Sequence, residues 1–215
     1  MQSTHNTLSE SIRAQSVELL NKQMTAAVDL HAQMKQAHWN VRGPGFIAIH
    51  ELFDKVSMVV ENYSDLIAER VGGLGGTSHS TIQVAPERSF LAPYPLDIVD
   101  EHQHVFAVSG RLAAFGQSVR EAIDQATTFG DTSTAELFTE ISRGIDLQLW
   151  FVESHIAPKM NQTSRSRTPR QKRHNGSQFT RATMRISDRP SARRDARRNG
   201  PRPKTSDDLQ SRYQT

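Results

Sequence analysis

The chain contains no cysteine. This absence excludes disulfide bonds, thiolate metal sites and a cysteine nucleophile, and it fits a reducing compartment. Long apolar runs are also missing, since none approaches the roughly 18 residues that a membrane-spanning helix needs. No early segment resembles the apolar region of a secretory signal. We therefore expect a soluble, cytoplasmic protein without a membrane partner.

Positive charge is scarce in most of the chain and concentrated at one end. Residues 1–161 hold 11 Lys and Arg against 19 Asp and Glu, a net charge of −8. Residues 162–215 hold 15 against 4, a net charge of +11, and 13 of the 15 are Arg. Large apolar residues are rare there, so folding would not offset the lost chain entropy. We predict a folded domain over 1–160 and a disordered Arg-rich tail over 161–215.

Apolar residues in the first part of the chain recur at steps of three and four, which is typical of amphipathic helices. The expected helices run from about Leu8 to the break at Val41–Gly45, from there to Gly72, from about Leu96 to Ala126, and from Asp131 or Thr132 to Pro158. Residues 77–97 contain three prolines and are long enough to cross a bundle lengthwise. The pattern predicts an all-α, ferritin-like four-helix bundle with one long crossover.

A polar stripe runs along the second predicted helix. His50, Asp54, Asp65 and Glu69 lie at steps of 4, 11 and 4 residues, which depart from one helix face by only about 40°, 20° and 40°. A solvated face is the ordinary interpretation of such a stripe. Two observations favour a metal site instead. The stripe contains His rather than Lys or Arg, and His38 precedes a tight reversal on the neighbouring helix.

Helix geometry divides these residues into two half-sites. Asp54 and Asp65 are 11 residues apart, or about 16 Å along a helix, whereas metal–ligand bonds are close to 2 Å. One half-site is therefore His38, His50 and Asp54, and the other is Asp65 and Glu69. Two chains paired antiparallel about a two-fold axis would bring each half-site to its complement. Imidazole and carboxylate ligands suit iron or another hard-to-borderline divalent metal.

Four runs resemble the Dps family of miniature ferritins, which protect DNA in starved bacteria. They are KQAHWNVRGPGFIAIHELFD at 35–54, SDLIAERVGGLGG at 64–76, YPLDI at 94–98 and LWFVESHI at 149–156. The resemblance covers roughly residues 8–157. It implies a dodecameric shell of four-helix bundles around a cavity, associated with the nucleoid.

The resemblance also implies a ferroxidase centre at each dimer two-fold. The matching ligands are His38, His50 and Asp54 of one subunit with Asp65 and Glu69 of its two-fold mate. The implied reaction is oxidation of Fe(II), preferentially by hydrogen peroxide, followed by deposition of ferric mineral inside the shell. Two irons per site and no haem are expected.

Several aromatic and imidazole side chains lie outside this ligand set. Trp39 adjoins His38 and is interpreted as a core aromatic, with the interception of stray oxidising equivalents as an alternative. His31 lies on the same helix face as His38, and we expect a packed or interface residue. His102 and His104 are two residues apart and cannot share a helix face, so both are expected at the surface.

Acidic residues near the start of the fourth helix have two interpretations. Asp131, Glu136 and Glu140 are candidates for a pore at a threefold axis, because family members place acidic residues there. They also fit an acidic first turn favoured by the helix dipole. Glu-x-x-His pairs, which 24-subunit ferritins and haem bacterioferritins carry within each bundle, are missing from the predicted core, and this disfavours both classes.

The basic tail predicts sequence-independent, salt-sensitive contact with DNA phosphates. In relatives the basic extension is often N-terminal and Lys-rich, whereas here it is C-terminal and Arg-rich. The candidate DNA-binding residues are Arg165, Arg167, Arg170, Lys172, Arg173, Arg193, Arg194, Arg197 and Arg198. Alternatives are an iron-storing miniferritin that does not bind DNA, a nucleoid architectural protein with a weak or zinc-occupied site, and an incidental or solubilising tail.

Overall fold

A computed structural model describes residues 1–156, and within them every regular element is helical. The helices are α1 (Glu10–Asn40), α2 (Phe46–Gly73), α3 (Ala85–Arg88), α4 (Glu101–Phe129) and α5 (Thr132–Glu153). The predicted tail at 161–215, its candidate DNA-binding residues and Pro158 lie outside the described part of the chain. No helix within that part is long and apolar enough to cross a membrane.

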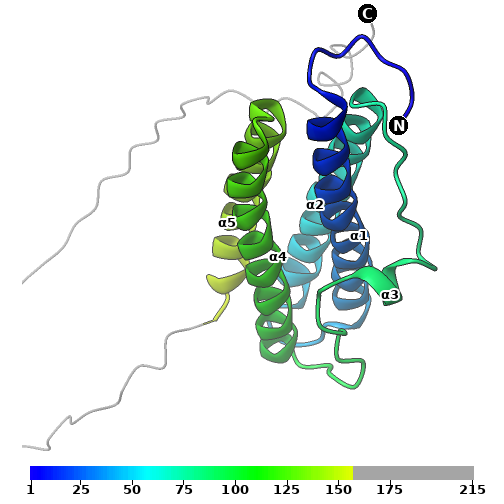
Figure 1. The fold of residues 1–215 in the computed structure, drawn as a ribbon. Coiled ribbons are helices and arrows are strands. Elements are labelled where there is room, and N and C mark those ends of the chain that lie inside the picture. The colour runs from blue at the N-terminus through cyan, green and yellow to red at the C-terminus, as the bar shows by residue number, and fades with distance from the viewer. Residues whose placement is uncertain (157–215) are drawn as a thin grey trace, which may run out of the picture. The chain divides into compact units, whose positions relative to one another are not determined.

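The four long helices form a bundle of two antiparallel pairs (Figure 1). α1 packs mainly against α2, and α4 packs mainly against α5. A tight turn joins the first pair, and Gly130, at φ 84°, joins the second. The segment that contains α3 connects the two pairs and runs along the length of the bundle (Figure 1). The predicted four-helix bundle with one long crossover is confirmed.

The core follows the predicted helical periodicity. On α2 the apolar stripe is buried throughout, at 8% exposure or less: Ile49, Phe53, Val56, Val60, Tyr63 and Ile67. The largest fully buried side chains, Phe53, Phe115 and Phe138, come from three different helices. Burying one side chain of this size stabilises the fold by roughly 1.5–3 kcal/mol. The bundle therefore holds each helix at a fixed rotation, which decides where the polar stripe of α2 points.

The third long helix begins later than the sequence pattern predicted. It starts at Glu101 rather than near Leu96, because Asp100 accepts hydrogen bonds from the backbone N–H groups of His102 and Gln103 as an N-cap. The backbone of Asp100 is extended, and the N–H of Arg42 donates to the carbonyl of Val99 at 2.9 Å. The start of α4 is thereby joined to the turn between α1 and α2.

His104 is not a surface residue, so that expectation was wrong. The prediction that the core holds no Glu-x-x-His pair was wrong as well, because Glu101 and His104 are both buried at this spacing, with their side chains hydrogen-bonded to Gly45 and Tyr94. His104 is 1% exposed, and its Nδ1 lies 2.7 Å from the hydroxyl oxygen of Tyr94. Burial lowers the pKa of His104 and raises that of Tyr94, so both groups are neutral. The spacing argument was correct only in that the two histidines diverge, since His102 is exposed. The hydrogen bond between Tyr94 and His104 holds the end of the crossover against α4.

α2 and α5 approach closely at a glycine. An ideal Cβ built on Gly144 would overlap the phenol oxygen of Tyr63 and lie 2.9 Å from its Cζ. The Tyr63 side chain is buried and belongs to the apolar stripe of α2, with Val60 and Ile67 on either side along the helix. The bundle therefore requires glycine at this point of α5 for the close approach of an aromatic ring.

Replacing Gly144 by Ala is expected to destabilise the bundle by about 1–3 kcal/mol, because the added methyl group displaces Tyr63. Gly110 offers a matched control within a helix, since a Cβ there meets nothing within 4 Å among the described residues. Gly110→Ala should stabilise by up to about 1 kcal/mol through helix propensity. Urea unfolding of both variants measures the difference, and equal shifts of the two midpoints would contradict the packing argument.

Candidate metal centre

Two histidine rings stack where α1 and α2 meet. His38 lies in the last turn of α1 and His50 near the start of α2, and the tight turn between the helices brings them together. Their ring centroids are 3.7 Å apart, with an angle of 21° between the planes. Each ring is bonded to the other residue's backbone. Nδ1 of His38 is 2.8 Å from the backbone carbonyl oxygen of His50. Nδ1 of His50 is likewise 2.8 Å from the backbone carbonyl oxygen of His38.

This reciprocal bonding determines where the protons lie. A carbonyl oxygen only accepts hydrogen bonds, so both Nδ1 atoms must carry a proton and donate it. In a neutral imidazole the other nitrogen then has a free lone pair. Histidines that bind metals usually donate the second ring N–H to a carbonyl or carboxylate in this way, which fixes the ring and its tautomer. In the neutral rings each Nε2 therefore has a lone pair that could bind a divalent metal.

Asp54 lies one helical turn beyond His50, but it is paired with a cation. Its Oδ1 is 2.6 Å from Nζ of Lys35 on α1, and the two side chains are 41% and 26% exposed. The hydrogen bond from Lys35 lowers the pKa of Asp54, with smaller contributions from the charges of Lys35 and of the two histidines. Asp54 is thus an ionised carboxylate, as a metal ligand must be. Within one subunit Oδ1 of Asp54 is paired with the Lys35 ammonium.

Lys35 was not predicted as part of the site. Its signal in the sequence is its position one turn before His38 and Trp39, on the helix that faces α2. Nζ of Lys35 also lies 6.0 Å from the centroid of the Trp39 ring. Trp39 itself is 60% exposed, so its interpretation as a core aromatic was wrong for the single subunit. Trp39 lies two residues after the fully buried Ala37, about 200° around the helix, and so on the opposite face of α1.

The second predicted half-site is separate from the first. Asp65 and Glu69 are exposed and lie farther along α2. Within residues 1–156, no three His, Asp or Glu side chains of one chain form a metal-binding group. The structure thus brings His38 and His50 together and leaves Asp54 on the next turn. Completion of the site by a second subunit stays a prediction.

Two further predictions concern side chains near these helices. His31 packs as expected, with its Nδ1 3.0 Å from the carbonyl oxygen of Ser57. Asp131 does not fit a pore, because it is 1% exposed and caps α5 by accepting from the N–H of Thr134. Its Oδ1 also lies 2.7 Å from Nη2 of Arg70. Asp131 was thus correctly predicted as an N-cap, and its carboxylate is enclosed within the subunit.

Hydrogen bonding also sets the charge of Asp131. Burial raises the pKa of this carboxyl, but the hydrogen bonds from Thr134, with smaller contributions from Ser16 and Arg70, lower it by more. The carboxyl group of Asp131 therefore stays ionised, and it stabilises the fold as the cap of α5 and the partner of Arg70. The other two pore candidates, Glu136 and Glu140, are exposed on α5 and stay predictions.

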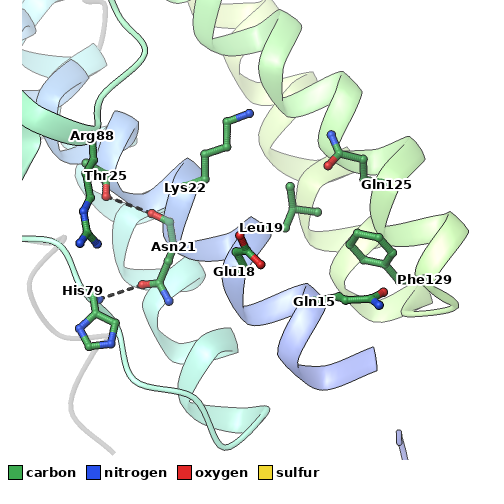
Figure 2. Close-up of a pocket in the computed structure, with 10 residues that line it drawn as sticks. All are labelled: Gln15, Glu18, Leu19, Asn21, Lys22, Thr25, His79, Arg88, Gln125 and Phe129. Atoms are coloured by element: carbon green, nitrogen blue, oxygen red, sulfur yellow. Dashed lines mark hydrogen bonds between the residues drawn. The ribbon is translucent and has the colours of Figure 1, made fainter. Parts of the chain in front are cut away.

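A large cavity lies away from His38 and His50, beside the first half of α1 (Figure 2). Asn21 fastens the crossover there, because its side-chain oxygen accepts from the N–H of His79 at 2.8 Å. The cavity reaches only as far as Thr25 on α1, which is about 20 Å along the helix from His38. Its one carboxylate is Glu18. This cavity is therefore not part of the candidate metal centre.

Comparisons with known proteins agree with the fold. A family model described as a ferritin-like domain matches residues 17–160. The chain is 40% identical over 156 residues to the DNA protection during starvation protein of Agrobacterium fabrum, covering 73% of this chain and 96% of that protein.

Solved structures show the same similarity. Dps from Microbacterium arborescens in the high iron form aligns with a TM-score of 0.65 and 30% identity, over 74% of this chain and 99% of that one. Dps from Mycobacterium smegmatis aligns with a TM-score of 0.70 and 26% identity, over 80% and 98%.

Removing the Lys35 ammonium is expected to strengthen metal binding at the half-site. Exposed ion pairs contribute up to about 1 kcal/mol, so Lys35→Met should bind Co(II) up to about fivefold more tightly at pH 7. The pKa of Asp54 should rise toward its ordinary value. Lys55→Met is a matched control, because Lys55 adjoins Asp54 but is exposed. Calorimetric titration measures both, and weaker binding by Lys35→Met would show that the lysine supports the site.

Proposed function

Because the chain belongs to the Dps family of ferritin-like proteins, we propose that it is a ferroxidase and iron-storage protein. It oxidises Fe(II) with hydrogen peroxide and stores Fe(III) as mineral inside an oligomeric shell. The observation that carries this proposal is the stacked pair of His38 and His50, whose carbonyl-bonded rings leave both Nε2 atoms free for a metal. Iron is the substrate of this site.

A second subunit completes the proposed centre. His38, His50 and Asp54 supply two imidazoles and one carboxylate, and the partner subunit's Asp65 and the partner subunit's Glu69 supply two more carboxylates. The chain has this full set at the spacing that an antiparallel two-fold requires. Such a mixture of nitrogen and hard oxygen ligands accommodates two ferrous ions. A dodecameric shell would carry one centre for each subunit.

The proposed reaction balances with two irons and one peroxide. Each Fe(II) gives one electron, the O–O bond of hydrogen peroxide breaks, and two protons complete two water molecules. Because both electrons arrive together, no hydroxyl radical is released. The carboxylates keep the ferrous ions close to each other, and the lone pairs of His38 and His50 fix them at the subunit. Lys35 donates to Oδ1 of Asp54 and therefore competes with a metal for this carboxylate.

Ferroxidase activity is tested by adding Fe(II) and hydrogen peroxide and following ferric absorbance. The double variant His50→Ala, Asp54→Ala should oxidise iron at least about tenfold more slowly, because even the loss of a group that only orients a ligand costs that much. Glu51→Ala is the matched control, since Glu51 lies between the two positions and is exposed. Its rate should equal that of the wild type.

The same assay separates the proposed enzyme from a nucleoid architectural protein with a weak or zinc-occupied site. Such a protein would oxidise iron at the rate of the double variant. Equal rates for wild type and double variant would therefore contradict the ferroxidase proposal. If zinc occupies the site, the wild type would oxidise iron faster than the double variant only after the zinc is removed. Treatment with a chelator before the assay tests this.

We also propose that the protein protects DNA in the cytoplasm, in association with the nucleoid, through residues 162–215. One similar protein is named a DNA protection during starvation protein. The charge distribution supports a separate DNA-binding segment, because residues 1–161 carry a net charge of −8 and the rest carry +11. Arginine binds phosphate through paired N–H groups, and contact with the backbone alone needs no base recognition.

Deleting residues 162–215 should abolish DNA retardation in a gel-shift assay while Fe(II) oxidation continues. With the full chain, binding should weaken roughly a thousandfold between 50 mM and 200 mM salt if six phosphates are neutralised. Replacing the tail by an uncharged Gly/Ser segment of equal length is the control for chain length. Undiminished binding without the tail would show that the bundle holds the DNA. An iron store that ignores DNA would show no retardation by either form.

A further inference from the structure

The helix that carries most of the metal ligands lacks a cap of its own. α2 begins after Gly45, which makes no side-chain capping bond, and its first turn has no acidic residue. Side chains of Ser9, Asp100 and Asp131 cap the other three long helices. The first N–H groups of a helix have no partner within the helix, and the dipole favours an anion there. A hydrogen-bond acceptor and a negative charge for the N-terminus of α2 must therefore come from another part of the chain.

Glu101 supplies that anion from a distant part of the sequence. It is the first residue of α4, and its Oε2 accepts a hydrogen bond from the backbone N–H of Gly45 at 2.7 Å. Only 8% of Glu101 is exposed. A buried carboxylate costs free energy unless it is hydrogen-bonded, and here it lies at the N-termini of α2 and α4. The Glu101 side chain thus joins the start of α2 to the start of α4.

The turn between α1 and α2 is shaped around this carboxylate. A Cβ on Gly43 would overlap the Glu101 carboxyl group, and one on Gly45 would lie 3.1 Å from its Oε2. Gly43 also has φ +155°, which side chains rarely adopt. The N–H of Arg42 donates to the carbonyl of Val99 in the same region. The turn is therefore held by a backbone bond and a buried side chain.

This turn is the covalent connection between the two metal-binding rings. The bonds between His38 and His50 are each 2.8 Å long, and both require the end of α1 and the start of α2 to keep their spacing. We propose that Glu101 is a positioning residue for the metal centre, holding the start of α2 so that the His38 and His50 rings keep their relative position at that centre. The link to metal binding rests on the function proposed above.

Co(II) alone serves as the probe of the assembled full-length protein. Glu101→Ala should bind Co(II) about tenfold more weakly, because orienting groups of metal ligands carry effects of this size. Glu101→Gln keeps the shape and one acceptor oxygen, so it should recover most of the affinity. Glu121→Ala is the matched control, since Glu121 is exposed on the same helix. If wild type binds Co(II) and Glu101→Ala binds it equally well, the inference is wrong.

Hydrogen exchange in the absence of metal tests the positioning separately from the function. Peptides that cover residues 41–50 should exchange at least about tenfold faster in Glu101→Ala, whereas peptides from α5 should not change. Unchanged exchange at 41–50 would overturn the inference whatever the metal result. A wild-type protein that binds no Co(II) would contradict the proposed function, and the exchange result would then decide the role of Glu101 alone.

A double-mutant cycle tests the contact itself. Gly45→Ala should destabilise the wild type, because the new methyl group approaches Oε2 of Glu101 and Cδ1 of Ile49. In the Glu101→Ala background the first of these obstacles is gone, so the same substitution should cost less. Urea unfolding of the four proteins measures the coupling. Additive effects would show that the carboxylate does not fill the turn.

Discussion

The paired hydrogen bonds between the histidine rings and the opposite backbone carbonyls are the constraint on which the site depends. They fix two tautomers at once, because Nδ1 of His38 and Nδ1 of His50 must both donate. They also bind the last turn of α1 to the first turns of α2. A small displacement of either helix would break both bonds together, since the rings and carbonyls belong to the same two residues. The orientation of the two rings and the packing of α1 against α2 thus depend on the same bonds.

The position of the site explains why the bundle needs support at this end. The turn that joins the two histidine helices is short, and α2 begins without its own capping side chain. The carboxylate of Glu101 and the backbone of Val99 reach this turn from the end of the crossover. That segment is in turn fixed by the buried pair of Tyr94 and His104. The positions of His38 and His50 therefore depend on contacts between residues far apart in the sequence.

Sequence periodicity predicted the helices and the buried stripe of α2, because a repeat of three and four residues reports directly on one helix face. The tight reversal that follows His38 placed it near His50. It failed where a long-range contact decides the outcome. His104 is buried by a tyrosine from the crossover, and Asp54 is paired with a lysine on another helix. Glu101 gave no signal, because its partner is a backbone N–H 56 residues away.

The charge distribution explains why iron and DNA would require different parts of the chain. An acidic surface attracts Fe(II) and repels phosphate, so residues 1–161, at −8, suit the metal and not the nucleic acid. The +11 of residues 162–215 has the opposite preference. Contact with DNA would weaken steeply with salt through counterion release. Direct bonds from His38, His50 and Asp54 to a metal, as proposed above, would be far less screened. A change of ionic strength alone should therefore separate the two activities without altering the protein.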